Sequence, residues 1–267
     1  NTYSIASDNK KNYQLFEKAE GGAGNNLKKY LAESQHLYDF VISDLIYSNY
    51  KSLKPLLTKR LLFNIHKLKL FHTFDNDIRK FFKNSDLQKV LEFTTVFLGG
   101  SPYNTPAFYT LISHTDFNLK IWHPLGGIYK VIEALHSLCD TYNVDIHTGE
   151  TVQKIDVKHV TAKSVTTNIS SYDTDIVISN ADYVHSETQL LDIPWQTYSA
   201  DYWNKKTLSP TAFVIYLGVG KKFKDIKHHN FYFEDSWTSH FKEVFKKPDW
   251  PETPSYYVHV PTKTDPS

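Results

Sequence analysis

The chain has 267 residues, with 30 Lys and Arg against 29 Asp and Glu, so its formal charge is +1. Hydrophobic residues make up 40% of it and aromatic residues 15%, which is enough for a sizeable core in one large domain or two smaller ones. This composition excludes a disordered tail. The balanced charge gives no reason to expect a nucleic acid as partner.

The cysteine content and the ends of the chain bear on its compartment and extent. A single cysteine, Cys139, excludes an internal disulfide framework and fits a reducing compartment such as the cytoplasm. No apolar run approaches the roughly 18 residues of a spanning helix, so we expect a soluble or peripherally attached protein. The chain opens on Asn1, contains no Met and stops at Ser267 after a strand-like run. We therefore expect an interior fragment.

Residues 7–113 show the apolar spacing of helices. Apolar side chains recur at intervals of three and four over residues 27–46, which predicts one long amphipathic helix. Further sets at 61–68 and 87–94 predict more helices, the last with Ser85 as its N-cap. The first third of the chain is therefore predicted to be mainly helical.

Residues 53–74 combine Lys and Arg with many large apolar side chains. A basic, strongly apolar helix of this kind can lie on a membrane surface, with its lysines reaching the headgroups. The alternative is a core helix with a solvated basic edge, which is the commoner use of an amphipathic pattern.

After Pro124 the pattern changes to an alternation of helix and strand. Residues 128–142 predict a helix, 144–147 and 151–157 predict short strands, and 175–179 predicts a compact apolar strand. This order is typical of a returning portion of a nucleotide-binding α/β domain.

Two later runs, 211–219 and 255–260, are rich in β-branched and aromatic residues. They predict strands of a second sheet on the substrate side. Taken together, the elements predict an α/β chain of mixed (α+β) type.

Two glycine pairs are candidates for turns beside a ligand. Gly99 and Gly100 follow an apolar run, so a helix is predicted to end there; a plain C-cap is the simpler interpretation and a ligand-facing turn the functional one. Gly126 and Gly127 lead into the next helix, where free backbone N–H groups would suit an anionic or polar ligand. No GxGxxG fingerprint is present, so these residues do not predict a complete dinucleotide-binding unit.

Thirteen histidines raise the question of a metal site. The adjacent His228 and His229 are predicted to point to opposite faces of a strand, and no HExxH or paired-cysteine spacing accompanies them, so we predict no metal site. No GxSxG elbow supports hydrolase chemistry. His123 could act as a general base, but a structural histidine is the simpler interpretation, and no catalytic side chain is assigned.

Several segments in a fixed order carry a family resemblance. They are FLGGSPYNTPAFYTLI at 97–112, IWHPLGGIYKVIEAL at 121–135, NVDIHTGETVQKI at 143–155, DIVISNADYVHSETQLL at 175–191 and TDPS at 264–267. In this order they resemble the carotenoid (phytoene) desaturases, flavin enzymes of the FAD-dependent amine oxidase superfamily. The resemblance covers nearly the whole chain and is weakest at its beginning.

The resemblance implies an FAD enzyme that removes hydrogens from a long polyene such as phytoene, with hydride transfer to the flavin. It implies part of a Rossmann-like FAD-binding domain together with a substrate domain that has a mixed sheet and a helical subdomain. On this basis residues 1–120 form the mainly helical, substrate- or membrane-facing subdomain. Residues 121–190 form the returning part of the FAD-binding domain, and 191–267 form the sheet and helices of the substrate domain.

The family's N-terminal phosphate-binding glycine loop and its C-terminal flavin-contacting segment have no match here. We therefore expect the chain alone not to complete an FAD site. By resemblance, Val152 reads the adenine edge with its backbone N–H and C=O, and Asn180 and Ala181 lie near the cofactor. Gly126 and Gly127 complete the predicted cofactor-binding set.

A C40 hydrocarbon offers no charge to bind, so its tunnel must be apolar and aromatic. The side chains that flank the glycine turns are the candidates to line it: Phe97, Leu98, Tyr103, Phe108 and Trp122. The water-insoluble substrate and the basic apolar stretch together predict peripheral membrane attachment.

Two alternatives stay open. A lipid or prenyl carrier on the same scaffold, as the Rab GDP-dissociation inhibitors illustrate, would need no cofactor motifs. Within the enzyme class, the sequence does not separate a desaturase from a polyene isomerase or a saturase, nor a C30 from a C40 substrate. It does not indicate an oligomeric state.

Overall fold

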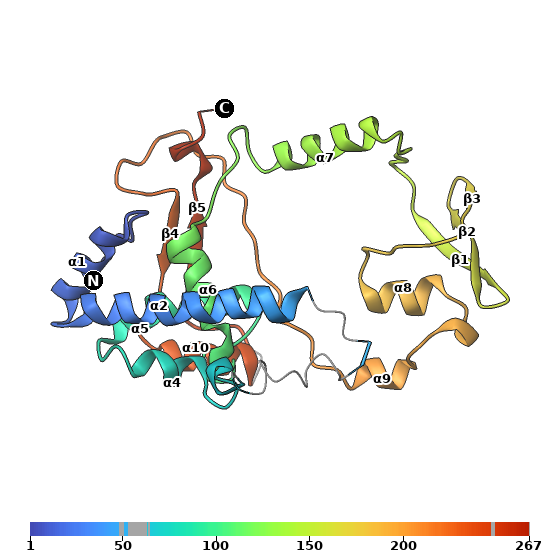
Figure 1. Ribbon diagram of the computed structural model, residues 1–267. Coiled ribbons are helices and arrows are strands. Elements are labelled where there is room, and N and C mark those ends of the chain that lie inside the picture. The colour runs from blue at the N-terminus through green and yellow to red at the C-terminus, as the bar shows by residue number, and fades with distance from the viewer. Residues whose placement is uncertain (48–50, 53–62, 64, 247–248, 267) are drawn as a thin grey trace. The chain divides into compact units, whose positions relative to one another are not determined.

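The computed structural model describes residues 1–47, 51–52, 63, 65–246 and 249–266 (Figure 1). The chain divides into two compact units, the first comprising residues 1–128 and 209–267 and the second residues 129–208. The functions assigned from the sequence to residues 1–120, 121–190 and 191–267 stay predictions.

Unit 1 is mainly helical. Its described helices are α1 (Asn9–Ala19), α2 (Ala23–Val41) with its π-helical continuation η1 (Ile42–Ile46), η3 (Ile65–Leu68), α4 (Phe74–Arg79), α5 (Ser85–Glu92), η4 (Phe93–Leu98), η5 (Ala107–Thr110), α6 (Leu111–His114), η6 (Thr115–Leu119), α10 (Trp237–Phe245) and η8 (Pro261–Lys263). The long helix predicted over residues 27–46 is confirmed, and so is the helical character of the first third.

Helix α2 carries the core of unit 1. Leu27, Tyr30 and Leu31 lie at helical spacing and are buried against α1 and α6. The main cluster of buried apolar side chains consists of Phe16, Ala23, Leu27, Tyr30, Leu31, Phe74, Ile78, Phe82, Leu87, Leu91 and Phe117. A second cluster forms around Leu37, Val41 and Leu68. Because these residues, apart from Phe82, come from α1, α2, η3, α4, α5 and η6, the cores fix how those helices pack.

Helix α5 begins one residue earlier than predicted. The Asn84 side chain caps it by accepting the backbone amides of Asp86 and Leu87, and Ser85 is the first helical residue. The N-cap prediction at Ser85 is therefore wrong by one position. Asn and Ser are equally good N-caps, and apolar spacing alone does not separate neighbouring candidates.

Unit 2 consists of a helix, a small sheet and shorter helices. Its elements are α7 (Tyr129–Thr141), β1 (Val152–Lys158), β2 (Thr161–Thr167), β3 (Ser171–Asp173), α8 (Tyr183–Leu190), η7 (Ile193–Trp195) and α9 (Ala200–Asn204). The three strands pair antiparallel in the order β1-β2-β3. The helix predicted over 128–142 and the strand predicted over 151–157 are confirmed.

Strands β4 (His229–Tyr232) and β5 (Tyr256–His259) form an antiparallel pair in unit 1, as predicted for residues 255–260. The strands predicted at 144–147, 175–179 and 211–219 are wrong, because these segments pair with no other strand in the described part of the chain. An apolar run forms a strand only where a neighbour accepts and donates its backbone hydrogen bonds.

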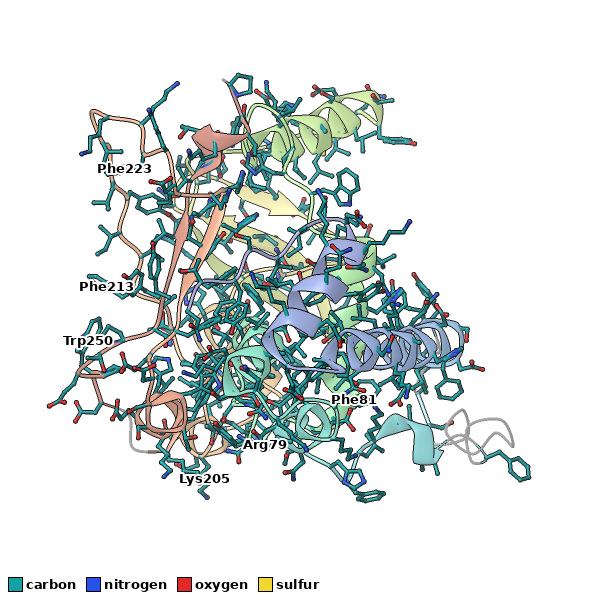
Figure 2. The ribbon with its side chains drawn as sticks, turned by 90° about the vertical axis from the view of Figure 1, so that its left-hand side faces the viewer. Arg79, Phe81, Lys205, Phe213, Phe223 and Trp250 are labelled. Carbon is teal, nitrogen blue, oxygen red and sulfur yellow. The ribbon has the colours of Figure 1, made fainter. Side chains whose placement is uncertain are left out.

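Many apolar side chains of the 211–219 run are exposed. Phe213 lies edge-on to Trp250, with ring centroids 5.8 Å apart, and both remain largely accessible (Figure 2). The run is therefore extended and apolar but not part of a sheet.

The described residues contain both helices and small antiparallel sheets, so the predicted mixed class is confirmed. All strand pairs in the residues described are antiparallel, and a Rossmann-like arrangement is not seen among them. Among the described helices, none combines the length and apolar character needed to cross a membrane. Residues 53–62 and 64 of the basic apolar segment predicted over 53–74 lie outside the described residues.

Candidate functional site

A row of aromatic rings crosses unit 1 from the β4–β5 pair to helix η4. We call it the aromatic row; in order it contains His229, Tyr257, Phe231, Phe93 and Phe97. Successive ring centroids are 5.9, 4.8, 4.3 and 5.3 Å apart. Phe97, Tyr257 and Phe231 keep 65%, 42% and 39% of their surface exposed. The row therefore offers a long apolar strip to a ligand.

The alternation of strand side chains builds the sheet end of this row. Phe231 lies opposite Tyr257 and His229 opposite His259, so these side chains share one face of the β4–β5 pair. Asn230 and Val258 point to the other face. The His229 ring is fixed by a 2.6 Å hydrogen bond between its Nδ1 and the Tyr257 hydroxyl.

Helix η4 supplies the other end, and Gly99 ends it. Gly99 has φ 68° and donates its amide to the Val96 carbonyl, so the predicted C-cap is confirmed. A Cβ on Gly100 would lie 2.5 Å from Oγ1 of Thr105, so this position requires glycine for close packing. The turn therefore holds η4 with Phe97 directed outward.

The five predicted substrate residues do not form one lining. Phe97 lies in the aromatic row, and Leu98 follows it at 37% exposed. Phe108 packs against the cluster of Leu37, Val41 and Leu68. Trp122 is 82% exposed, and its indole N–H donates to the Leu119 carbonyl.

Tyr103 faces α10. Its hydroxyl shares a 2.8 Å hydrogen bond with Thr238, and its ring contacts Phe241 at 6.1 Å between centroids. The small cavity of about 130 Å³ that it lines is below the usual size of a ligand pocket, about 300 Å³ or more. Tyr103 therefore serves packing in the described part of the chain.

The predicted cofactor residues lie in both units. Gly126 and Gly127 have φ 84° and 88°, but their amides are engaged by Oδ2 of Asp265 at 2.9 Å and by the Pro124 carbonyl at 3.1 Å. The two glycine amides expected to be free are therefore already hydrogen-bonded. That these glycines contact a flavin stays a prediction.

Val152 begins β1, which is an edge strand of its three-stranded sheet in the described residues. An edge strand leaves part of its backbone N–H and C=O groups without a strand partner, as the reading of an adenine edge would require. Asn180 and Ala181 lie in the exposed turn before α8. These positions are accessible, and their contact with a cofactor likewise stays a prediction.

A buried carboxyl group lies directly behind the aromatic row. Glu92 precedes Phe93, is 1% exposed and accepts the Trp237 indole N–H at 2.7 Å. Burial and the nearby charge of Asp75 raise the pKa of Glu92 to about 7, although the Trp237 hydrogen bond opposes this. The Glu92–Trp237 hydrogen bond therefore joins the end of α5 to the start of α10.

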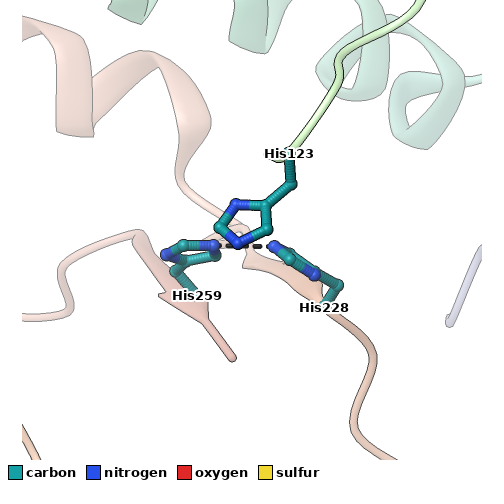
Figure 3. A group of neighbouring side chains, drawn as sticks. All are labelled: His123, His228 and His259. Carbon is teal, nitrogen blue, oxygen red and sulfur yellow. Dashed lines mark hydrogen bonds between the residues drawn. The ribbon is translucent and has the colours of Figure 1, made fainter. Parts of the chain in front are cut away.

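Three histidines converge at the far end of the β4–β5 pair (Figure 3). His123, His228 and His259 each offer a ring nitrogen, and these atoms lie within 4.8 Å of one another. Burial and the neighbouring imidazoles lower the pKa of His228. We call these three residues the histidine cluster.

The sequence did not indicate this cluster or most of the aromatic row. The prediction that the adjacent His228 and His229 point to opposite faces is wrong, because their ring centroids lie 4.4 Å apart and both rings contact His259, which the sequence did not single out. The cluster joins a loop, the residue before one strand and the end of another. Three ligands from distant segments have no fixed spacing in the sequence. The pairing of β4 with β5 brings His228 and His259 together, so a correct prediction of this strand pair would have been the signal.

Comparisons with known proteins show the family to which the chain belongs. The family model described as flavin containing amine oxidoreductase matches residues 29–264. The chain is 34% identical to a carotenoid 3,4-desaturase of Haloarcula japonica over 98% of its length, which covers 53% of that protein. It is 30% identical to a zeta-carotene-forming phytoene desaturase of Myxococcus xanthus over 94% of its length, covering 48% of that protein.

A phytoene desaturase of Fusarium fujikuroi is also 30% identical, over 89% of this chain and 42% of that protein. The chain thus spans about half the length of the curated relatives it matches. The resemblance seen in the ordered sequence segments is confirmed. The chain belongs to the flavin-containing amine oxidoreductase family, in which its relatives are carotenoid and phytoene desaturases.

Proposed function

We propose that this chain works in an FAD-dependent desaturase that removes hydrogens from a long polyene such as phytoene. The observation that carries the proposal is the similarity to a carotenoid 3,4-desaturase over 98% of the chain. The family is flavin-containing, and the flavin when bound supplies the hydride acceptor. The protein supplies binding and orientation.

The aromatic row supports a polyene as the ligand. A flat hydrocarbon chain gains contact from successive ring faces and edges, and it needs no charged partner. Burial lowers the pKa of His229, so the one imidazole of the row stays neutral near pH 7. The row thus matches a long uncharged substrate better than a polar one.

The carrier alternative is not favoured, because the relatives reported above are named as desaturases. A carrier and an enzyme would share the apolar strip, so the strip alone does not decide between them. The enzymatic assignment rests on the family.

Product analysis tests this function. We expect the full-length gene product, incubated with phytoene and flavin, to yield products with longer conjugation, separated by chromatography. Phe97→Ala should raise the KM for the polyene by about tenfold, because loss of one aromatic contact costs about 1.4 kcal/mol. Phe223→Ala, at a side chain 48% exposed and outside both the row and residues 53–74, is the matched control.

Unchanged phytoene in the presence of bound flavin would count against the desaturase. An unchanged KM in Phe97→Ala would count against the row as the substrate surface.

We further propose a cytoplasmic protein that attaches peripherally to membranes. The support is the insolubility of a polyene in water and the basic apolar sequence of residues 53–74. In liposome flotation the full-length gene product should rise with vesicles that contain anionic lipid. Protein that stays in the aqueous fraction would refute this attachment.

A further inference from the structure

The histidine cluster brings together three segments of unit 1. His123 lies in the loop that leads to Gly126, His228 directly precedes β4, and His259 ends β5. In Figure 3 the three rings face a common centre. Nε2 of His228 and Nε2 of His259 are 2.7 Å apart.

We propose that His123, His228 and His259 bind one divalent transition-metal ion, with Zn²⁺ as the preferred ion. Neutral imidazole is a common protein ligand for this class of ion, and three protein ligands plus one further group are typical of zinc sites. Each histidine contributes one ring nitrogen.

The spacing of the nitrogen atoms requires only a small adjustment. Two ligands about 2.0–2.1 Å from a tetrahedral ion are about 3.3 Å apart. The 2.7 Å separation of His228 and His259 would widen by roughly 0.6 Å, and the metal would replace the hydrogen bond between them. The ring nitrogen of His123 lies within 4.8 Å of the ring nitrogens of the other two histidines, and it would move closer to them. Side-chain rotation can supply both changes.

The surroundings of the cluster match those of a metal site. Nδ1 of His228 is hydrogen-bonded to Oγ1 of Thr264, which leaves Nε2 to face the centre. Metal-ligating histidines are commonly oriented by such a bond at their second nitrogen. Asp265, 6% exposed, lies with Oδ2 3.3 Å from Nε2 of His123 and holds the Gly126 amide with the same oxygen.

The Asp265 carboxylate adds a negative charge beside three imidazoles, which favours a dication there. The ammonium group of Lys263 is turned away, because it donates to the carbonyl oxygens of Phe223 and Lys224. A bound ion would therefore have the Asp265 carboxylate near His123, with the Lys263 ammonium directed to the two carbonyl oxygens.

The ion would join the loop before α7 to the β4–β5 pair. The His259 ring also stacks on His229, with centroids 5.4 Å apart and planes inclined by 9°. Because His229 is the first member of the aromatic row, the ion would steady one end of that row. This inference does not depend on the desaturase function, since it concerns metal binding alone.

Zinc content and zinc titration test the site. The full-length gene product, purified without a histidine tag and treated with a chelator, should bind one Zn²⁺ per chain in calorimetry. His123→Ala, His228→Ala and His259→Ala should each weaken binding by more than about 100-fold, and Thr264→Val by about 10-fold, because the latter removes only the orienting bond. His136→Gln, at an exposed histidine of α7 outside the cluster, is the matched control and should leave the affinity unchanged.

Co²⁺ provides a second readout that does not depend on enzyme activity. A tetrahedral site gives intense visible absorption bands, and these should vanish in the three alanine variants. Circular dichroism shows whether each variant folds, and Thr264→Val, which keeps all three ligands, remains informative if an alanine variant does not. Absence of a stoichiometric zinc site in the wild type, or an affinity unaffected by all of the histidine variants, would overturn the proposal.

Discussion

The helical part of unit 1 and helix α7 of unit 2 bury their apolar faces to very different extents. Leu27, Leu87 and Leu91 are each 0% exposed in the first. In α7, by contrast, Leu135 and Leu138 are each 54% exposed, and none of the residues of that helix is buried. An amphipathic helix gains most of its stability from covering its apolar face. Other described residues thus cover the apolar side chains of the helical core, whereas they leave the apolar face of α7 exposed.

A pair of leucine substitutions tests this contrast and has the largest expected effect. Leu87→Ala should lower the free energy of unfolding of the 267-residue chain by about 2–5 kcal/mol, because it leaves a cavity in a closed core. Leu135→Ala should change it by no more than about 0.5 kcal/mol. Urea denaturation followed by circular dichroism measures both. Equal losses of unfolding free energy in the two variants would show that the apolar face of α7 is covered and would contradict the contrast between the two helical regions.

The buried carboxyl group of Glu92 allows the stability of the core of unit 1 to be tested through its pH dependence. Burial raises the pKa of Glu92 from its usual value of about 4.5 to about 7 in the folded chain. Between these values the folded state keeps a proton that the unfolded state releases, so stability falls as pH rises from 4.5 to 7 and levels off above. The loss amounts to at most about 3 kcal/mol.

Glu92→Gln should remove this dependence, because its amide stays neutral and still accepts the Trp237 indole N–H. Urea midpoints of the variant and the wild type should agree near pH 5 and differ in favour of the variant near pH 8. A wild-type urea midpoint that does not decline between pH 4.5 and 7 would contradict the raised pKa of Glu92.

The sequence predicted what depends on local pattern. Apolar periodicity predicted α2 and α7, and the glycine at 99 predicted the end of η4, because helix period and positive φ are properties of short segments. The strand predictions at 175–179 and 211–219 failed because a strand is defined by its partner. Similarly, Phe93 and Phe231 meet only through tertiary packing, although each is an ordinary core-type residue in its own segment.

The family segments predicted the function more specifically than any single residue. They indicate a flavin enzyme, and the family match over residues 29–264 confirms the family. They did not show which of the predicted substrate residues lie together: Phe108 and Tyr103 pack against neighbouring helices, whereas Phe97 lies in the aromatic row, and their contact with a substrate stays a prediction. Aromatic residues near a glycine turn are common in cores, so sequence proximity could not separate the two uses.

The most direct test of the account is anaerobic mixing of the flavin-loaded, full-length gene product with polyene while the flavin spectrum is recorded. The account predicts that phytoene or a related carotenoid bleaches the oxidised flavin band and that the polyene gains conjugation in the same step. An oxidised band that persists with every polyene tested, although the protein binds both flavin and polyene, would contradict it.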